Sequence, residues 1–397
     1  MGSVNLDNTG SGSAITLSSD GTSLLLNGTA IGGGGGADLY AANDVNATAP
    51  SATGDNSVAI GPSSEANSAD ATAFGYRSEA KASKAVAIGE GRAGGASATA
   101  ISIGTTSTAY GATGVRSIAM GYQAKATGTY STALGQNSVA TGQDSFAIGK
   151  SLASSTNSFA AAIATNSSSY GASGSNSIAG GDYNKATATD SLCWGGDSNV
   201  AQSGAKSAVV GGWQNNCSGA YSFIGGGRGN KITSGSYSRA GGLQADVNGT
   251  GIDTWSSGRF SSDGDAQTSK RVLIASTTDA TATVLGTQNI NSLAANQVTL
   301  PNNSAFAFHG TIVARQQAAD GTACAAWKVE GLIRREGSAG TTVLVNSATT
   351  VLDNTPNWGM ALSANTSLGC LKIEVTGAAS TDIRWVATIH TSEVTYA

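Results

Sequence analysis

The 397-residue sequence holds few side chains that could do chemistry, and only two of them are histidines. His309 stands in FAFHG and His390 in ATIHTSE, and both words read as strands of the last part of the chain. A zinc site needs three or four ligands, and no cysteine or acidic cluster lies near either histidine in the sequence. We therefore interpret both as ordinary strand histidines and predict no metal site. The alternative is an ion held by three copies of one histidine on a symmetry axis.

Acidic residues are the second source of chemistry, because cleavage of a polysaccharide needs two carboxyl groups at a fixed separation. Glu65 and Glu79 occupy the same place in successive repeat units. Two negative charges so close together would raise the pKa of one of the two carboxyl groups. We expect an exposed ladder of glutamates instead, because solvent screens such a repulsion.

Residues 225–231 (GGGRGNK) fail the phosphate-loop pattern, and residues 261–267 (SSDGDAQ) lack the last glutamate of a calcium loop. We predict no catalytic residue, no cofactor and no enzyme activity, with a polysaccharide-degrading spike as an alternative.

Aromatic residues are the better candidates for a binding role. Tyr76 and Tyr122 each follow a glycine that ends a repeated apolar word, so they could line one edge of the repeat region. Trp327, Trp358 and Trp385 lie in the last part of the chain. Exposed tyrosine and tryptophan suit sugar or protein surfaces. We predict these five as binding residues, with packing in the core as the alternative.

The four cysteines lie in unrelated contexts and form no CxxC pair, which fits a protein made in a reducing cytosol. Cys217 falls at a position that the repeats predict to face inward, so we expect it to be structural and inert. A disulfide between Cys324 and Cys370 stays open from the sequence.

Composition excludes several functions. The net charge of −4 argues against nucleic acid as a partner, because nucleic-acid binders carry basic patches. No run of 18 apolar residues occurs, which predicts no insertion into a membrane, and the first residues do not read as a signal peptide. The 55 glycines and a charged fraction of only 12 % favour small side chains stacked in a regular pattern.

A repeat supplies that pattern. The words VAIG, TAFG and VAIG end at Gly61, Gly75 and Gly89, which are 14 residues apart. The phase wanders after Gly89, and the words resume with RSIAMG, YSTALG and DSFAIG. Both halves of the unit alternate with period two, so each unit reads as strand, glycine turn, strand, turn. A short fixed period indicates a solenoid in which one unit makes one coil.

The later repeats are wider and carry asparagine. The words IAGG, CWGG, VVGG and FIGGG are each followed, three residues after the last glycine, by an asparagine. These four residues are Asn184, Asn199, Asn215 and Asn230. On successive coils they are predicted to form an amide ladder along the solenoid.

The large apolar residues of the repeats need a second surface. A coil of 14 residues is too narrow to enclose Val58, Phe74 and their equivalents, so we expect copies of the chain to associate.

We predict an all-β chain with four parts. Residues 1–50 form an attachment segment with a glycine-rich linker, 51–250 the repeat shaft, 251–270 a connector, and 271–397 an antiparallel β-sandwich.

The repeated words NSVAIG, RSIAMG, YSTALG and DSFAIG, with S-x-A after the glycine, resemble the head repeats of the YadA-type trimeric adhesins over about residues 55–245. The resemblance implies a left-handed parallel β-roll and a homotrimer. The sequence departs from the adhesins because no signal peptide, heptad stalk or membrane anchor is recognised in it.

The flanking segments, GSAITLSSDGTSLLLNGTAIGG and TLPNNSAFAFHGTIVAR among them, resemble segments of tail fibres and tailspikes of tailed bacteriophages. This resemblance implies a virion protein, made in the host cytoplasm, that docks to the tail, baseplate or an adaptor through its N-terminus and binds a host surface glycan or protein. The alternatives are a structural virion component, a bacterial adhesin and a polysaccharide-degrading tailspike.

Overall fold

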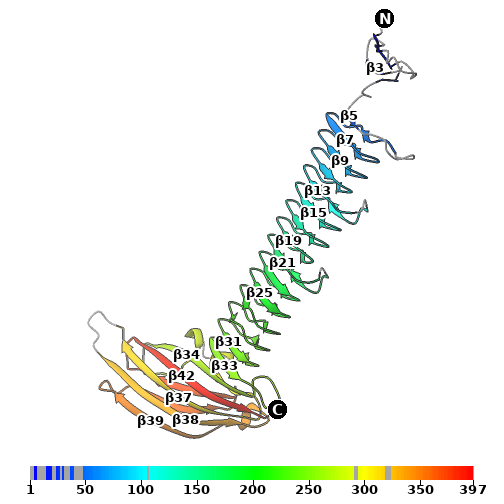
Figure 1. The fold of residues 1–397 in the computed structure, drawn as a ribbon. Coiled ribbons are helices and arrows are strands. Elements are labelled where there is room, and N and C mark those ends of the chain that lie inside the picture. The colour runs from blue at the N-terminus through cyan, green and yellow to red at the C-terminus, as the bar shows by residue number, and fades with distance from the viewer. Residues whose placement is uncertain are drawn as a thin grey trace. The chain divides into compact units, whose positions relative to one another are not determined.

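The computed structural model of the chain describes residues 48–104, 107–165, 167–289, 294–317 and 323–396, together with the backbone of five short strands before residue 40. The described fold is all-β (Figure 1). Its only helical segments are three short 3₁₀ turns, η1 (Thr287–Asn289), η2 (Ala294–Asn296) and η3 (Ala339–Thr341). The chain divides into two compact units, Met1–Asn176 and Ser177–Ala397, and each is described by itself.

The first unit opens with a four-stranded antiparallel sheet made of β1 (Val4–Leu6), β2 (Ile15–Ser19), β3 (Leu24–Leu26) and β4 (Thr29–Ala30). Within this sheet β2 pairs antiparallel with β3, with Leu17 opposite Leu26. Residues 32–35 of the predicted glycine-rich linker lie outside the described residues. The next strand already belongs to the solenoid, so the repeat begins before the predicted boundary at residue 51.

Coils of two parallel strands make up the rest of the first unit. The odd-strand sheet consists of β5 (Gly36–Leu39), β7 (Ser57–Ile60), β9 (Thr72–Phe74), β11 (Val86–Ile88), β13 (Thr99–Ile101), β15 (Ile118–Met120), β17 (Thr132–Leu134), β19 (Phe146–Ile148) and β21 (Phe159–Ala161). The even-strand sheet consists of β6 (Ser51–Ala52), β8 (Glu65–Ala66), β10 (Glu79–Ala80), β12 (Arg92–Ala93), β14 (Gly111–Ala112), β16 (Lys125–Ala126), β18 (Val139–Ala140), β20 (Leu152–Ala153) and β22 (Gly171–Ala172).

The interior between the two sheets is built from alanine and serine. Ala59, Ala73 and Ala87 are paired in register on successive odd strands and are fully buried. A serine such as Ser117 lies at the start of many coils, and its hydroxyl donates a hydrogen bond to the Gly114 carbonyl at 2.7 Å. Small side chains are therefore what the narrow coil admits, as the composition predicted.

The second unit continues with the same kind of coil. Its odd strands are β23 (Ile178–Asp182), β25 (Leu192–Asp197), β27 (Ala208–Val210), β29 (Phe223–Ile224), β31 (Arg239–Leu243) and β33 (Ile252–Ser257). Its even strands are β24 (Lys185–Ala186), β26 (Val200–Ala201), β28 (Asn216–Cys217), β30 (Lys231–Ser234) and β32 (Asp246–Asn248).

The predicted amide ladder is confirmed in these coils. The side-chain amide of Asn215 donates to Oδ1 of Asn199 at 3.1 Å, and that of Asn230 donates to Oδ1 of Asn215 at 3.1 Å. Oδ1 of Asn184 accepts from the backbone N–H of Asn199 at 2.9 Å. All four asparagines are fully buried, so the ladder satisfies polar groups that would otherwise be costly to bury.

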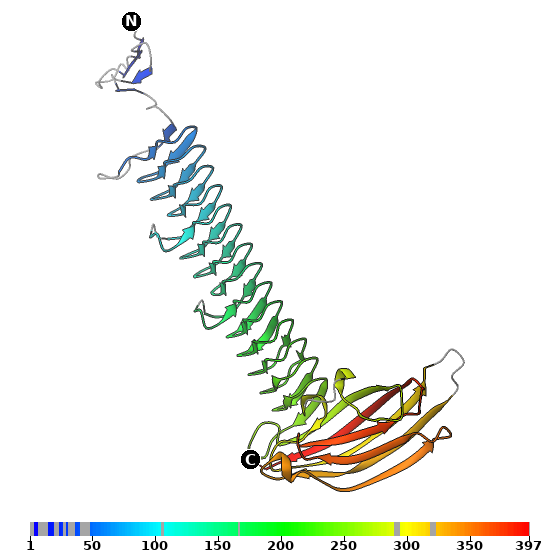
Figure 2. The ribbon, with the colours of Figure 1, turned by 180° about the vertical axis from the view of Figure 1, so that it is seen from behind.

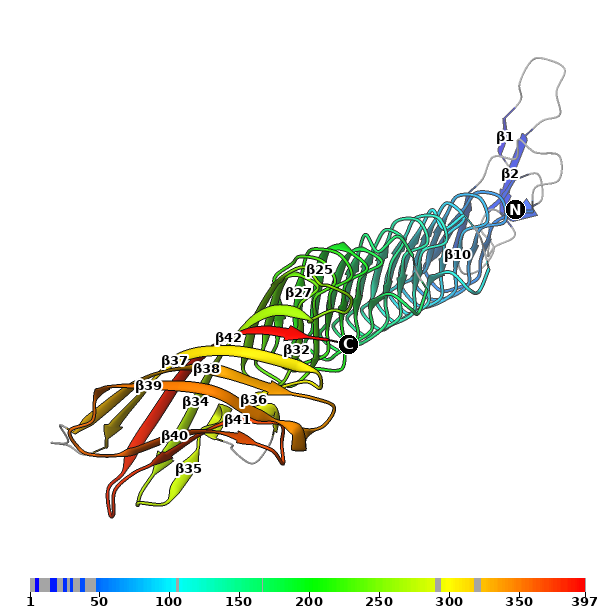
Figure 3. The ribbon, with the colours of Figure 1, turned by 90° about the horizontal axis from the view of Figure 1, so that it is seen from below.

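Antiparallel strands follow the last coil. One sheet has the order β34 (Ala266–Thr277), β42 (Ile383–Thr395), β37 (Ser304–Gln316), β38 (Cys324–Arg335), β39 (Val343–Asp353). A smaller sheet consists of β35 (Ala282–Val284), β36 (Val298–Thr299), β40 (Gly359–Asn365) and β41 (Cys370–Thr376), and Figure 3 shows the two sheets next to each other. They share one hydrophobic core. The predicted antiparallel strands are confirmed, and the sandwich stays a prediction.

The predicted connector, residues 251–270, is mostly strand. Its first part is β33, which pairs in parallel with β31, and its last part begins β34, which pairs antiparallel with β33. Only residues 258–265 form a loop. Strand pairing therefore continues from the last coil into the antiparallel sheet, and this places the loop beside both.

Candidate functional site

An aromatic groove lies on the outer face of the last odd strands of the second unit. Its floor is made of glycines, among them Gly225 and Gly241, and its sides are the rings of Phe223 and Trp255. The groove has a volume of about 530 Å³. A Cβ atom on Gly241 would lie 2.9 Å from the Trp255 ring, so the glycine is what lets the indole lie flat against the sheet. Trp255 is 61 % exposed.

Trp255 also borders a second groove, of about 600 Å³, on its other side. The opposite wall includes Phe260, which is 80 % exposed, and apolar side chains of the antiparallel sheet such as Leu332 and Val394. Two exposed rings beside an apolar wall offer faces on which a sugar ring or an aromatic side chain could stack.

A polar cleft lies nearby, where the 258–265 loop meets β32 and β36. It has a volume of about 400 Å³, and its lining includes Asp246, Asp263, Asp265, Gln267 and Arg335. Gln267 holds the backbone of Asp246 with two hydrogen bonds of 3.0 Å, one donated and one accepted.

The aspartates of the cleft differ in their electrostatics. Burial raises the pKa of Asp246, and the charge of Asp263 adds to the rise, while the Thr233 hydroxyl and Lys231 oppose it. Burial also disfavours the charged form of Asp263, but ion pairs with Lys231 at 2.6 Å and Arg259 at 2.5 Å outweigh it and lower the pKa. Asp246 therefore holds a proton more readily than Asp263 does.

Asp265 has a structural role. Burial disfavours its charge, yet the backbone N–H groups of Ser261, Ser262 and Phe260 donate to its carboxylate and lower its pKa. These bonds fold the 258–265 loop and present Asp263 to the cleft.

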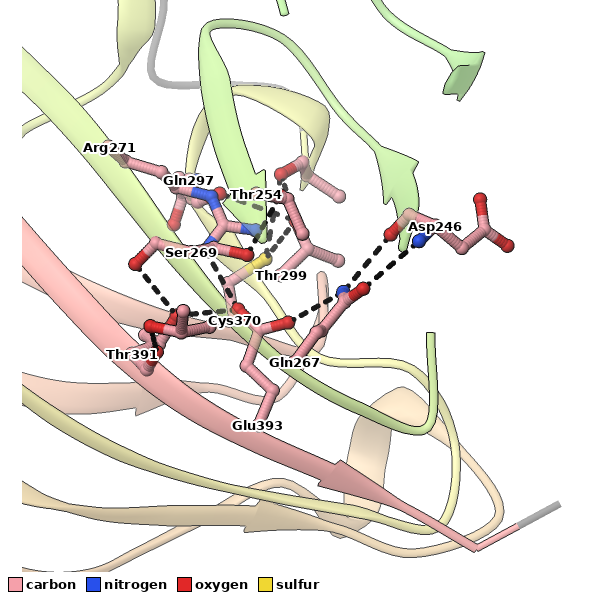
Figure 4. Close-up of polar contacts among 12 residues, drawn as sticks. Asp246, Thr254, Gln267, Ser269, Arg271, Gln297, Thr299, Cys370, Thr391 and Glu393 are labelled. Atoms are coloured by element: carbon pink, nitrogen blue, oxygen red, sulfur yellow. Dashed lines mark hydrogen bonds and ion pairs between the residues drawn. The ribbon is translucent and has the colours of Figure 1, made fainter. Parts of the chain in front are cut away.

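A small inner chamber of about 60 Å³ adjoins the cleft and shares Asp246 and Gln267 with it (Figure 4). Arg271 lines the chamber and is only 5 % exposed. Its Nη1 lies 3.9 Å from Oε1 of Glu393, and neither Nε nor Nη1 has a hydrogen-bond partner among the described residues. Burial lowers the pKa of Arg271, and Glu393 opposes that shift. The second oxygen of Glu393 accepts from Gln267 at 2.9 Å, which links the chamber to the cleft.

The predicted tryptophans are not on the surface. Trp327, Trp358 and Trp385 are 3 %, 5 % and 0 % exposed, and the rings of Trp327 and Trp385 stack with centroids 5.8 Å apart. Trp327 and Trp385 alternate onto the buried faces of β38 and β42, and Trp358 stands just before β40. All three belong to the hydrophobic core, so we correct their assignment as binding residues. Tyr76 and Tyr122 are 49 % and 50 % exposed, and their binding role stays a prediction.

The two histidines lie directly opposite each other, His309 on β37 and His390 on β42, with stacked rings 5.3 Å apart. In the described ranges no group of three or more histidine, cysteine or acidic side chains is arranged to hold a metal ion. Glu65 and Glu79 are adjacent in register, as predicted, and Lys81 lies within 3.5 Å of both.

Sequence reasoning missed Trp255, Asp246 and Asp263 as site residues. The sequence did carry a signal for Trp255. Gly241 lies opposite Trp255 on the neighbouring strand, and a glycine there leaves room for the indole ring. No local signal could have joined Asp246 to Asp263, since the loop that brings them together is folded by Asp265.

Comparison with protein families identifies the coils. Residues 52–78, 66–91, 112–138 and 126–151 match the family described as the YadA head domain repeat (2 copies). These matched segments lie in the coils of the first unit. The expected resemblance is thereby confirmed for these YadA head repeats, and no curated protein matches the chain.

Two solved structures are similar to the chain at a low level. One is the tailspike protein gp49 from Acinetobacter baumannii bacteriophage Fri1, a capsular polysaccharide depolymerase, with 10 % identity over 85 % of this chain and 69 % of that chain and a TM-score of 0.22. The other is the tailspike protein of Acinetobacter phage vB_ApiP_P1, with 11 % identity over 91 % of this chain and 81 % of that chain and a TM-score of 0.16.

The Fri1 tailspike is an enzyme, and it contradicts the prediction that this chain has no enzyme activity, which we withdraw. In the part of the chain that the structure describes, no helix has the length and apolarity to cross a bilayer.

Proposed function

We propose that the chain is a receptor-binding tail protein of a bacteriophage, a homotrimer that attaches the virion to a glycan of the host cell surface. Its N-terminal segment docks to the tail, the YadA head repeats form the shaft, and the last part of the chain carries the recognition site. The observation that carries the proposal is the aromatic groove around Trp255 on the last coils of the second unit. The YadA head repeats matched within residues 52–91 and 112–151 support it.

The outer faces of the two sheets in the first unit support the homotrimer. The odd strands from β7 to β21 carry apolar side chains on their outer face, and the most exposed include Phe74, Ile118 and Met120 at 53 %, 39 % and 39 %. The even strands present charged residues such as Glu79 and Arg92, which pair with each other. A continuous apolar face on a thin rod is best covered by sister copies, because three identical rods can bury the same face together.

The experiment is binding to a printed array of bacterial surface polysaccharides. The full chain is expected to bind at least one glycan, and Trp255→Ala is expected to weaken that binding tenfold or more, because stacked rings are common hot spots. Trp213→Ala is the matched control, since Trp213 is also exposed but stacks with Arg228 outside both grooves. Absence of glycan binding by the full chain, with intact trimers, would refute the proposal.

The polar cleft favours a second candidate function, hydrolysis of the bound polysaccharide. Asp246 would donate its proton to the leaving oxygen as the glycosidic bond breaks, and the ionised Asp263 would stabilise the positive charge on the sugar. Water would then add to the sugar and return a proton to Asp246. The opposite shifts of their pKa values support these roles.

Release of reducing ends from the polysaccharide that the chain binds tests this second function. Asp246→Asn is expected to reduce turnover at least a hundredfold without changing binding. Asp144→Asn is the control, because Asp144 is an exposed aspartate of the first unit that lines neither the cleft nor either groove. Equal turnover by Asp246→Asn and the native chain would rule the cleft out as the catalytic site.

A further inference from the structure

The inner chamber lies where the last coils of the second unit meet the antiparallel strands. Figure 2 shows the end of β42, in red, close to the last coils, in green. The backbone N–H of Thr395, at that end, donates to the carbonyl of Asp265 in the 258–265 loop at 3.0 Å. The lining of the chamber comes from β32, β33, β34, β37 and β42. Its walls are therefore held by parallel coils and antiparallel strands together.

Arg271 occupies an inward-facing position of β34 that would ordinarily hold a small or apolar side chain. The inner positions of this strand read Ser269, Arg271, Leu273 and Ala275, and all four are buried. A guanidinium at such a place loses its hydration, which is costly unless its N–H groups find acceptors. The partners of Arg271 therefore decide whether the chain alone satisfies this group.

Glu393 balances the charge of Arg271 without accepting a hydrogen bond from it. Its Oε1 lies 3.9 Å from Nη1 of Arg271 and accepts from the hydroxyl of Thr391 at 2.5 Å, while its Oε2 accepts from Gln267 at 2.9 Å (Figure 4). Nε and Nη1 of Arg271 are left without acceptors among the described residues, although both are buried. An anionic group from outside the chain would satisfy these donors, because charged hydrogen bonds are the strong ones.

Arg335 brings a second guanidinium to the adjoining polar cleft. Its Nη1 donates to the carbonyl of Leu300 at 2.7 Å, and its buried Nε has no hydrogen-bond partner among the described residues. Arg271 and Arg335 both lie close enough to Cys370 for their charges to oppose the rise in the pKa of that thiol. The two guanidinium groups therefore act on the same small region between the sheets.

The charges around the cleft and the chamber leave room for one monoanion. The positive side chains are Lys231, Arg259, Arg271 and Arg335, and the carboxyl groups are Asp246, Asp263, Asp265 and Glu393. Burial raises the pKa of Asp246, so this carboxyl group gives up its charge most readily. With Asp246 protonated, four positive side chains face three carboxylates. One bound negative charge then completes the balance, whereas a dianion would exceed it.

The volumes of the two spaces fit a sugar that carries a carboxylate. The chamber has a volume of about 60 Å³, and a single water molecule needs roughly 10–15 Å³. A carboxylate, with three heavy atoms, fits the chamber, but a sugar ring does not. The cleft, of about 400 Å³, has room for a ring. Because Asp246 and Gln267 line both spaces, a ring in the cleft can place a carboxylate in the chamber.

We propose that Arg271 binds the carboxylate of an acidic sugar in the host polysaccharide, with the sugar ring in the polar cleft and the carboxylate in the inner chamber. The inference rests on the proposed function, because it names the class of glycan that the chain recognises. Arg271 replaces the hydration that the carboxylate loses, and Arg335 adds attraction from the cleft. A neutral sugar leaves the buried donors unpaired and binds weakly.

The first test removes the carboxylates from the ligand. The array polysaccharide that the native chain binds is treated with a carbodiimide and borohydride, which turn sugar carboxylates into primary alcohols. Affinity is expected to fall about tenfold or more, because charged hydrogen bonds are lost. A mock treatment without carbodiimide is the control. Unchanged affinity after reduction, or a bound glycan that has no carboxylate, would overturn the inference and leave the proposed function intact.

The second test removes the guanidinium from the protein. Arg271→Met is compared with the double variant Arg271→Met, Glu393→Gln, which leaves no buried carboxylate without its counter-charge. Both are expected to bind the untreated polysaccharide about tenfold more weakly than the native chain, and the reduced polysaccharide within about twofold of it. Arg384→Gln is the matched control, since Arg384 is an exposed arginine of β42 that lines neither the cleft nor either groove.

Circular dichroism checks the fold of each variant. Equal weakening toward treated and untreated polysaccharide by the double variant would overturn the inference, because it would assign Arg271 to the fold alone.

The third test needs no polysaccharide and uses acetate as a free carboxylate. At constant ionic strength, replacing chloride by acetate is expected to raise the melting temperature of the native chain by about 1 °C and to leave that of Arg271→Met unchanged. An equal response of the two proteins, including no response in either, would overturn the inference. Absence of array binding by the native chain would refute the proposed function itself, while the acetate response still reports on the chamber.

Discussion

At the residue scale, the interior of the coils decides which side chains are reactive. Cys193 and Cys217 take places in the coil interior that other coils fill with alanine, valine or isoleucine, and both are fully buried. Burial raises the pKa of Cys193 to about 12 and that of Cys217 to about 11. Burial also raises the pKa of Cys370, whereas Cys324 is exposed. All four are free, so no disulfide joins Cys324 to Cys370.

We predict that one thiol per native chain reacts quickly with a disulfide reagent at pH 8. The thiolate is the reactive form, and a pKa of about 11 leaves roughly one Cys217 in a thousand ionised at that pH. Cys324→Ser is expected to abolish the fast phase, and denaturation is expected to expose the remaining thiols. Fast reaction of two or more thiols in the folded protein would contradict the burial of the coil cysteines.

At the element scale, glycine corners let neighbouring coils approach. Gly121 has a φ of +114°, and a Cβ atom there would lie 2.8 Å from the carbonyl carbon of Gly135 on the next coil. Gly149 has a φ of +67°, and nothing lies within 4 Å of its Cβ position. Glycine is therefore needed at position 121 both for close packing of coils and for its backbone conformation. At position 149 it is needed for the backbone conformation alone.

We predict that Gly121→Ala lowers the free energy of unfolding more than Gly149→Ala does. The first change combines a strained φ with a backbone clash and is expected to cost about 3 kcal/mol, whereas the second carries the strain alone, about 1 kcal/mol. Thermal unfolding followed by circular dichroism measures both. Equal melting temperatures for the two variants would show that the corners do not pack as the structure describes.

At the scale of the whole molecule, the two sheets of the first unit face different surroundings. The outer face of the odd-strand sheet is apolar, and the rings of Phe146 and Phe159 stack on it with centroids 5.5 Å apart. The outer face of the even-strand sheet carries ion pairs between Lys81, Glu79 and Arg92. This asymmetry is the physical basis for proposing that sister copies cover one face only.

We predict that Met120→Asp breaks the proposed trimer, because a charge would be buried among apolar side chains of the other copies. Val139→Asp is the matched control, since Val139 lies on the outer face of the even-strand sheet beside Lys125. Light scattering of both variants and the native chain checks the outcome. A trimer that survives Met120→Asp would place the contact between copies elsewhere.

The sequence by itself determined the coils and the pairing of residues between them. Side chains alternate with period two within each half coil, and coils repeat about every 14 residues. Only one alignment of neighbouring coils then places glycines opposite glycines, which is why the positions of Asn215 and Cys217 were predictable. The same alternation placed Ala325, Trp327 and Val329 on one face of β38, so the burial of Trp327 was also within reach of the sequence.

Only the tertiary structure decided where the clefts lie. Local alternation tells which side chains share a face, but not which face another element will cover. The polar cleft joins β32, the 258–265 loop and Arg335 of β38, which are far apart in the chain, and Trp255 became a groove wall because glycines on the neighbouring strands leave its ring uncovered. Such sites depend on long-range packing, and that packing has no local period to read.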